Sequence, residues 1–232
     1  MKPKTTDHLG WLNVGNETGM IQILTLENLV AKFPNEELVG MEVGSAYGGG
    51  VETGARIFKG HGKFYGYDTF EGHPKDLSVI PGDLEEFCMD MWYDDPHFGR
   101  GERLTYEYQR KVLDNWGLDN AVLVKGRINE HSFDDIDRVH FAILDLDLIK
   151  SMRTAYKAIR DKIVVGGYLF FHDALPPEHL PMIHNLVYNQ VLPEGRWKII
   201  RESNDGNLCA LERWKFTVGN INNRLLDMNG GP

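Results

Sequence analysis

The chain has 232 residues, of which 42% are hydrophobic and 25% are charged. A chain of this size can bury roughly 70% of its unfolded surface around one core. Its formal net charge of -9 would repel nucleic-acid phosphates and anionic membrane surfaces, so we expect neither nucleic acid nor membrane as a partner. Cys88 and Cys209 lie far apart in no metal-like spacing, which fits core thiols in a reducing compartment. No signal peptide or membrane-length apolar run is found, and a cytoplasmic protein is expected.

Strand-like and helix-like segments alternate along the chain. Apolar residues at helical spacing in residues 20–33, ahead of Pro34, predict a first helix. Further helices are predicted in VETGARIFKG, LTYEYQRKVLDNWG and SMRTAYKAIRDKI. Strands are predicted at residues 37–44, 63–70, 121–126, 139–147 and 167–174. The alternation predicts an α/β fold: a doubly wound, mostly parallel, seven-stranded Rossmann-like sheet with helices on both faces.

The last part of the chain changes character. WKIIRE and LCALERW flank the turn pair Asp205-Gly206, so an antiparallel hairpin is predicted at the C-terminal edge of the sheet. We expect one domain over residues 1–232, in which residues 1–35 form a helical cover. Residues 71–103 are rich in Pro, Gly, Asp and aromatic residues and are expected to form a lid or substrate insertion, or else a disordered surface insertion. Residues 215–232 are expected to be a tail, either frayed or an oligomer contact.

The stretch MEVGSAYGGG, residues 41–50, places a glycine cluster directly after the first predicted strand. In open α/β sheets, ligands lie beyond the carboxyl ends of the strands, and glycines allow the turn to approach them. Nicotinamide binding would require G-x-G-x-x-G and an acid about 20 residues later. Here three residues separate Gly44 from Gly48, and Asp68 lies 26 positions beyond Glu42. A phosphate-binding loop would require a Gly-Lys-Ser/Thr ending, which is missing, so both nucleotide interpretations fit poorly.

The spacing Glu-x-Gly-x-x-x-Gly-x-Gly resembles the first motif of class I S-adenosylmethionine-dependent methyltransferases. YDTFEGHP, LVKG, LDLDLIKS and VGGYLFFHD, in that order, resemble the macrocin O-methyltransferase family of sugar O-methyltransferases, over roughly residues 38–175. The resemblance implies S-adenosylmethionine as cofactor and a hydroxyl of a small molecule, a sugar or a glycosylated natural product, as methyl acceptor. The expected cofactor-binding residues are Glu42, Gly44, Ser45, Gly48, Gly49, Asp68, Thr69, Phe70, Gly126 and Asp145.

The resemblance also implies a divalent cation, because related enzymes place metal ligands at Asp145 and at positions 172 and 173. Independently, Asp145 and Asp173 are predicted at the ends of neighbouring parallel strands, where two carboxylates repel unless a cation or a shared proton lies between them. Mg²⁺ fits such oxygen ligands, and Asp147 would be a supporting acceptor on the same face as Asp145. Acids simply solvated at a sheet edge are the alternative.

His172 stands where the related enzymes usually carry an acid. It is a metal ligand beside Asp145 and Asp173, the general base, or a histidine that is only hydrogen-bonded to its neighbour. Methyl transfer requires the acceptor hydroxyl to lose a proton, and the catalytic residues expected to take it are Asp145 or His172. A metal that holds the acceptor oxygen would favour a diol or catechol-like acceptor. A homodimer or higher homo-oligomer is expected.

Three other functional classes compete with this interpretation. A nicotinamide oxidoreductase is disfavoured by the glycine spacing, and a non-catalytic binding module is disfavoured because both the glycine turn and the acid cluster are retained. A metal-independent methyltransferase acting on nitrogen or another small-molecule acceptor is the nearest alternative. It becomes preferable if Asp145 and Asp173 lie too far apart to share an ion.

Overall fold

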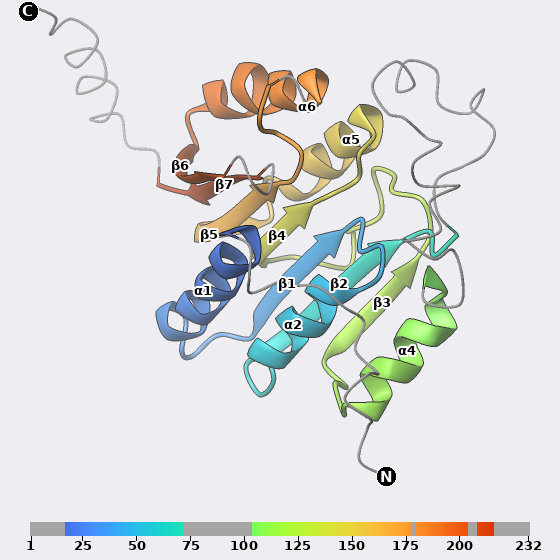
Figure 1. Ribbon diagram of the computed structural model, residues 1–232. Coiled ribbons are helices and arrows are strands. Elements are labelled where there is room, and N and C mark those ends of the chain that lie inside the picture. Colours follow the sequence, from blue (N-terminus) through green and yellow to red (C-terminus); the bar gives the residue numbers. More distant parts are fainter. Residues whose placement is uncertain (1–16, 72–103, 178–179, 204–207, 216–232) are drawn as a thin grey trace, which may run out of the picture.

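A seven-stranded sheet forms the centre of the computed structural model, which describes residues 17–71, 104–177, 180–203 and 208–215 (Figure 1). In chain order, the elements are α1 (Glu17–Lys32), β1 (Leu38–Val43), α2 (Gly49–Ile57), β2 (Gly62–Asp68), α4 (Tyr106–Asn115), β3 (Ala121–Lys125), β4 (Val139–Leu144), α5 (Ile149–Ile159), β5 (Ile163–Phe171), α6 (Pro181–Leu186), the π-helical turn η3 (Val187–Val191), the 3-10 turn η4 (Leu192–Glu194), β6 (Trp197–Ser203) and β7 (Leu208–Arg213). No helix in these ranges is both long and apolar enough to span a membrane.

The strand order is β3-β2-β1-β4-β5-β7-β6. The first five strands of this order pair in parallel, whereas β7 pairs antiparallel with both β5 and β6. The predicted doubly wound, mostly parallel sheet with an antiparallel C-terminal pair is therefore confirmed. The Asp205-Gly206 turn and residues 72–103 of the predicted lid lie outside the described residues, as do residues 1–16 and 216–232.

Helices cover both faces of the sheet (Figure 1). On one face, Leu26 and Leu29 of α1, Ala55 of α2 and Leu113 of α4 join one buried apolar cluster. On the other face, Met152 of α5 and apolar residues of α6 and η3 join a second cluster. Each fully buried Leu, Phe or Met contributes about 1.5–3 kcal/mol relative to an exposed one, so the two clusters supply most of the driving force for folding.

The central strand β4 shows why the sequence predicts a parallel sheet. All six of its residues, VHFAIL, are buried, because helices cover the sheet on both faces. The Phe141 ring packs against two neighbouring rings. Its centroid lies 6.1 Å from that of Phe64 in β2 and 5.0 Å from that of Phe170 in β5. A continuous apolar run, rather than an alternating one, is the sequence pattern of such a strand.

The carboxyl ends of the parallel strands are level. Val43 lies opposite both Tyr67 and Leu144, and Leu144 lies opposite Phe171. The residues that follow these strand ends therefore meet at one edge of the sheet. The order of the strands reverses between β1 and β4, which is the point where open α/β sheets usually bind their ligands.

Three predicted strand boundaries are wrong by at least three residues, and one of them is the start of the fifth strand, at Ile163 and not at residue 167. The fourth strand ends at Leu144 and not at Asp147, and the fifth ends at Phe171 and not at residue 174. Asp147 and Asp173 both have φ 58°, a left-handed conformation that cannot continue a strand. The reason for expecting Asp147 on the same face as Asp145 therefore does not apply, because neither residue lies in a strand.

Candidate active site

The turn after β1 is built on glycine. Gly44 has φ 92°, and a Cβ atom added there would lie 1.7 Å from the backbone oxygen of Asp145. Its N–H donates to Tyr67 O at 2.8 Å, while the N–H of Asp145 donates to Val43 O at 2.8 Å. Gly48, with φ 77°, precedes α2, whose first residue is Gly49. These hydrogen bonds hold the ends of β1, β2 and β4 together. The Gly44 backbone lies so close to Asp145 that a side chain at position 44 would collide with it.

Glu42 lies beneath this turn. Its carboxylate accepts a hydrogen bond from the Val51 N–H at the start of α2. Gly50 leaves room for it, since a Cβ at position 50 would lie 2.3 Å from Glu42 Oε1. Burial, followed by the nearby Asp145 carboxylate, raises the pKa of Glu42 well above its ordinary value. Glu42 is therefore placed to support the turn from within the sheet, in surroundings that disfavour its charged form.

Asp68 connects the turns that follow β1, β2 and β3. Its Oδ2 accepts the Ala46 N–H and its Oδ1 accepts the Phe70 N–H, both at 2.8 Å. Its backbone oxygen accepts the Gly126 N–H at 2.9 Å. A carboxylate has about four acceptor positions, so Asp68 retains capacity for hydroxyl groups of a ligand.

Two other predicted cofactor residues have inward side chains. The Ser45 hydroxyl is buried next to Gly66, and the Phe70 ring is 4% exposed and packs against Tyr106. Only their backbone groups can face a ligand. Thr69 hydrogen-bonds to Asp68 Oδ1 at 3.4 Å, which places it in the same turn. The cofactor contacts of all these residues remain predictions.

Asp145, His172 and Asp173 form a tight cluster at the ends of β4 and β5. His172 Nδ1 lies 3.1 Å from Asp145 Oδ1 and 3.2 Å from Asp173 Oδ2. One potential ligand atom from each of the three residues lies within 4.8 Å of the others. The Asp145 and His172 side chains are 31% and 28% exposed, and Asp173 is 8% exposed, so the cluster opens to solvent on one side. Two carboxylates and an imidazole at this spacing fit the ligand set of one divalent cation.

The two carboxylates also affect the charge of His172. Burial by itself lowers the pKa of this imidazole, but Asp145 and Asp173 outweigh it and raise the pKa well above its ordinary value. With no metal bound, the two carboxylates therefore favour the protonated imidazole, whose positive charge balances theirs. A cation at this site would have to replace that proton.

The predicted site residues thus lie along one edge of the sheet. A backbone hydrogen bond connects Gly126 to Asp68, and the Gly44 backbone lies against the backbone oxygen of Asp145. A further contact connects Asp145 to His172 and so completes the series from β3 to β5. The glycine turn and the Asp145–His172–Asp173 cluster flank the β1–β4 switch point from opposite sides.

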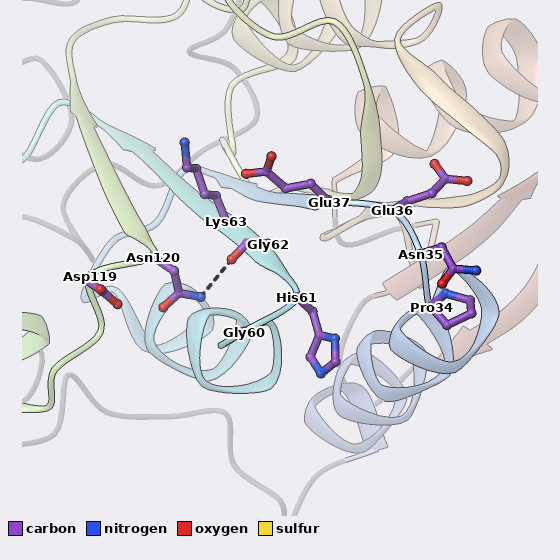
Figure 2. A pocket seen from close by; sticks show the side chains of 10 residues that line it. All are labelled: Pro34, Asn35, Glu36, Glu37, Gly60, His61, Gly62, Lys63, Asp119 and Asn120. Atoms are coloured by element: carbon purple, nitrogen blue, oxygen red, sulfur yellow. Dashed lines mark hydrogen bonds between the residues drawn. The ribbon is translucent and has the colours of Figure 1, made fainter.

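A separate pocket of about 650 Å³ lies at the opposite edge, where the strands begin. Figure 2 shows its lining, in which the Asn120 side chain donates to Gly62 O at 3.1 Å. Acidic side chains (Glu36, Glu37 and Asp119) and the basic Lys63 share this wall. None of the residues predicted for cofactor or metal lines it, so the candidate active site remains at the carboxyl edge.

The sequence did not reveal two residues that shape the site. Ala46 has φ 42°, and its carbonyl accepts a hydrogen bond from Gln109 Nε2 of α4 at 2.6 Å. Gln109 is completely buried. An amide among the apolar positions of a predicted helix was the available signal, but its partner is 63 residues away and could not be identified from spacing.

The chain matches no protein-family model and no curated protein sequence. Among solved structures it is similar to CalS11, a calicheamicin methyltransferase, with 20% identity over 87% of this chain and 81% of that chain, at a TM-score of 0.62. It is also similar to the O-methyltransferase NovP, with 18% identity over 88% and 84% of the two chains and a TM-score of 0.65.

A third similar structure is an rRNA methylase from Streptococcus thermophilus, with 16% identity over 87% of this chain and 99% of that chain and a TM-score of 0.53. One of these proteins is described as a calicheamicin methyltransferase and another as an rRNA methylase, so a likeness at this level of identity concerns the fold. Together with the strand order, it shows that this chain has the class I methyltransferase fold.

Proposed function

We propose that this protein is an S-adenosylmethionine-dependent O-methyltransferase that uses a divalent cation to hold a hydroxyl group of a small-molecule acceptor. The observation that carries the proposal is the direct contact between Gly44 and Asp145. It joins a turn suited to a cofactor without phosphates to a cluster suited to a hard cation. Similar solved structures include CalS11, a TDP-rhamnose 3'-O-methyltransferase, and the O-methyltransferase NovP, and they support the same chemistry.

The cofactor would bind along the turns after β1, β2 and β3. Asp68 would accept hydrogen bonds from the ribose hydroxyls, and the backbone near Gly44 and Ser45 would approach the methionine part. Glu42 would support this turn from below, and Gly126 is open enough for a ligand, since no atom lies within 4 Å of an added Cβ. These roles rest on position at the strand ends and on the resemblance of the motif.

The acceptor would bind beside Asp145, His172 and Asp173. A divalent cation bound there supplies a positive charge that lowers the pKa of the acceptor hydroxyl. In the reaction, the acceptor oxygen forms a bond to the methyl carbon while the bond from that carbon to sulfur breaks. The hydroxyl proton passes to Asp145 or His172. The chain's main contribution is to align the two reactants, which can supply several kcal/mol of the barrier reduction.

A small-molecule acceptor is favoured over RNA. One similar structure is an rRNA methylase, but this chain carries a net charge of -9, which disfavours binding to a phosphate backbone. The similar protein CalS11 is described both as a calicheamicin methyltransferase and as a TDP-rhamnose 3'-O-methyltransferase. A sugar or glycosylated natural product with neighbouring hydroxyl groups is therefore the proposed acceptor class.

The test separates cofactor binding from the metal-dependent step. Calorimetric titration should show binding of S-adenosylmethionine and no binding of NAD, and a chelator should leave this binding intact. Methyl transfer to a panel of sugar and catechol acceptors should stop in the chelator and resume when Mg²⁺ or Mn²⁺ is restored. The reason for the split is that the proposed cation contacts the acceptor and not the cofactor.

A pair of variants sharpens this test. Asp173→Asn should bind S-adenosylmethionine normally but lose at least about tenfold in transfer rate, the loss expected when a metal ligand is weakened. Asp119→Asn removes an exposed acid at the opposite edge of the sheet and should change neither property. Failure of the wild-type protein to bind S-adenosylmethionine would refute the proposed function.

A metal-independent methyltransferase is the second candidate. The observation that favours it is the position of His172 between the two carboxylates, where an imidazolium already balances their charge. In that case the chelated enzyme would transfer methyl groups at the full rate. Asp145 and Asp173 would then serve to orient His172 and the acceptor.

A further inference from the structure

The buried amide of Gln109 is unusual for its position on α4. The helix residues around it that face the core, Val112 and Leu113, are apolar and at most 2% exposed. Burying an amide is unfavourable unless it forms hydrogen bonds, so an amide at this place needs a partner. Gln109 Nε2 donates to the backbone oxygen of Ala46 at 2.6 Å.

Ala46 lies at the centre of the turn between β1 and α2. Its φ of 42° is left-handed, a conformation that disfavours every residue with a side chain by comparison with glycine. Two hydrogen bonds hold it from opposite ends of the residue. Asp68 Oδ2 accepts its N–H at 2.8 Å, and Gln109 donates to its carbonyl.

The same helix also contacts the neighbouring turn after β2. Tyr106, the first residue of α4, meets the Phe70 ring edge-on, with ring centroids 5.5 Å apart and an interplanar angle of 88°. Phe70 is left-handed as well, with φ 55°, and its N–H donates to Asp68 Oδ1. One helix therefore contacts both turns that converge on Asp68.

We propose that Gln109 is a positioning residue for the cofactor: it acts through Ala46 and fixes the shape of the turn that receives S-adenosylmethionine. This inference rests on the proposed function, since it assigns the turn to that cofactor. The Gln109–Ala46 hydrogen bond favours the left-handed conformation before the ligand arrives. Its loss removes no group that would contact the ligand, but binding then includes the cost of ordering the turn.

The experiment compares four proteins: wild type, Gln109→Met, Ala46→Gly and the double variant. Methionine has similar length but cannot donate the hydrogen bond. Calorimetry should show S-adenosylhomocysteine binding to Gln109→Met about tenfold more weakly, the size expected for one lost hydrogen bond. Ala46→Gly should restore the affinity of Gln109→Met to within about threefold of wild type, because glycine adopts left-handed φ without a steric penalty.

Val112→Ala provides the matched control. It removes buried packing from the same helix without touching the turn, so it should lower the melting temperature and leave the affinity unchanged. Should Gln109→Met fold poorly, Ala46→Val leaves α4 intact and disfavours left-handed φ, and it should also weaken binding. Restored affinity in the double variant would show that Gln109 acts by positioning the turn. If Gln109 only supported the fold, a substitution at Ala46 would not correct the loss of packing.

The possible outcomes distinguish failure of the role proposed for Gln109 from failure of the proposed function. Equal affinity of wild type and Gln109→Met refutes the role of Gln109 while leaving the proposed function intact. Weak binding that Ala46→Gly fails to restore also refutes it, since Gln109 would then act by another route. A wild-type protein that binds no S-adenosylhomocysteine refutes the proposed function and this inference with it.

Discussion

At the scale of single residues, Gly44 is the point where backbone geometry joins the two halves of the candidate site. Its φ is 92°, and an added Cβ would lie 1.7 Å from Asp145 O. Gly60 has a similar φ of 83° but no atom within 4 Å of an added Cβ. The two glycines therefore share one backbone requirement and differ in the space around them.

Alanine substitutions at Gly44 and Gly60 should distinguish the cost of a left-handed backbone from the cost of a steric clash. Gly60→Ala should lower the free energy of unfolding by about 1 kcal/mol, from the left-handed backbone alone. Gly44→Ala should lower it by about 3 kcal/mol, because the strand ends must also move apart. Urea unfolding followed by far-UV circular dichroism measures both. Equal losses would show that the β1 and β4 ends can shift without cost.

The candidate site was predictable from sequence to the extent that strand ends determine it. Asp68, Asp145 and Asp173 follow apolar runs, and parallel strands bring such residues to one edge of a sheet. The conformation beyond the strand ends was not predictable. Left-handed φ at Ala46 is accompanied by hydrogen bonds with Asp68 and Gln109, which no local sequence pattern specifies.

At the scale of elements, one helical segment was predicted from its apolar spacing and another was not. The predicted helix at residues 20–33 is confirmed as α1, because its apolar spacing follows one face. The segment α6 to η4 was not predicted, although Ile183, Leu186, Val187 and Val191 lie at helical spacing and are buried. The apolar spacing in this segment is typical of a helix, so the helix could have been predicted from the sequence alone.

The connection from α1 to β1 depends on a buried histidine of β4. His140 is 1% exposed, and its Nδ1 accepts the Val39 N–H at 3.1 Å. Glu36 lies 3.4 Å from its Nε2, Arg138 is paired to Glu36, and the Phe33 ring stands edge-on 5.1 Å away. Burial outweighs the opposing effect of Glu36 and, with the help of Arg138, lowers the pKa of His140.

This arrangement predicts loss of stability in mild acid. The unfolded chain binds the His140 proton more tightly than the folded chain does, so the free energy of unfolding should fall as the pH drops below about 6.5. A protonated ring also cannot accept the Val39 N–H. Urea unfolding at pH 7.5 and 5.5 should show a larger decrease for wild type than for His140→Asn, whose side-chain oxygen can replace Nδ1. His172, whose pKa shift is opposite, is present in both proteins; an equal pH dependence would contradict the prediction.

At the scale of the whole molecule, one sheet connects the site to its most distant strands. β4 lies between β1 and β5, and β7 continues from β5 with all of Leu208, Cys209, Ala210 and Leu211 buried. The two apolar clusters run along both faces of this sheet, and each includes residues of β1, β4, β5 and β7. No break in packing therefore separates the parallel strands from the antiparallel pair among the described elements.

Continuity of this kind predicts that ligand binding stabilises distant strands as much as near ones. At a concentration 100 times its dissociation constant, S-adenosylhomocysteine should raise the free energy of unfolding by about 2.7 kcal/mol. Hydrogen exchange measured by mass spectrometry should show this increase for the slowest amides of β1, beside the proposed cofactor, and equally for those of β7. The exposed residues of the edge strand β6 serve as a control, because they can exchange through local opening without global unfolding. Protection confined to β1 and β2 would mean that the β5–β7–β6 part unfolds independently, in spite of the shared clusters.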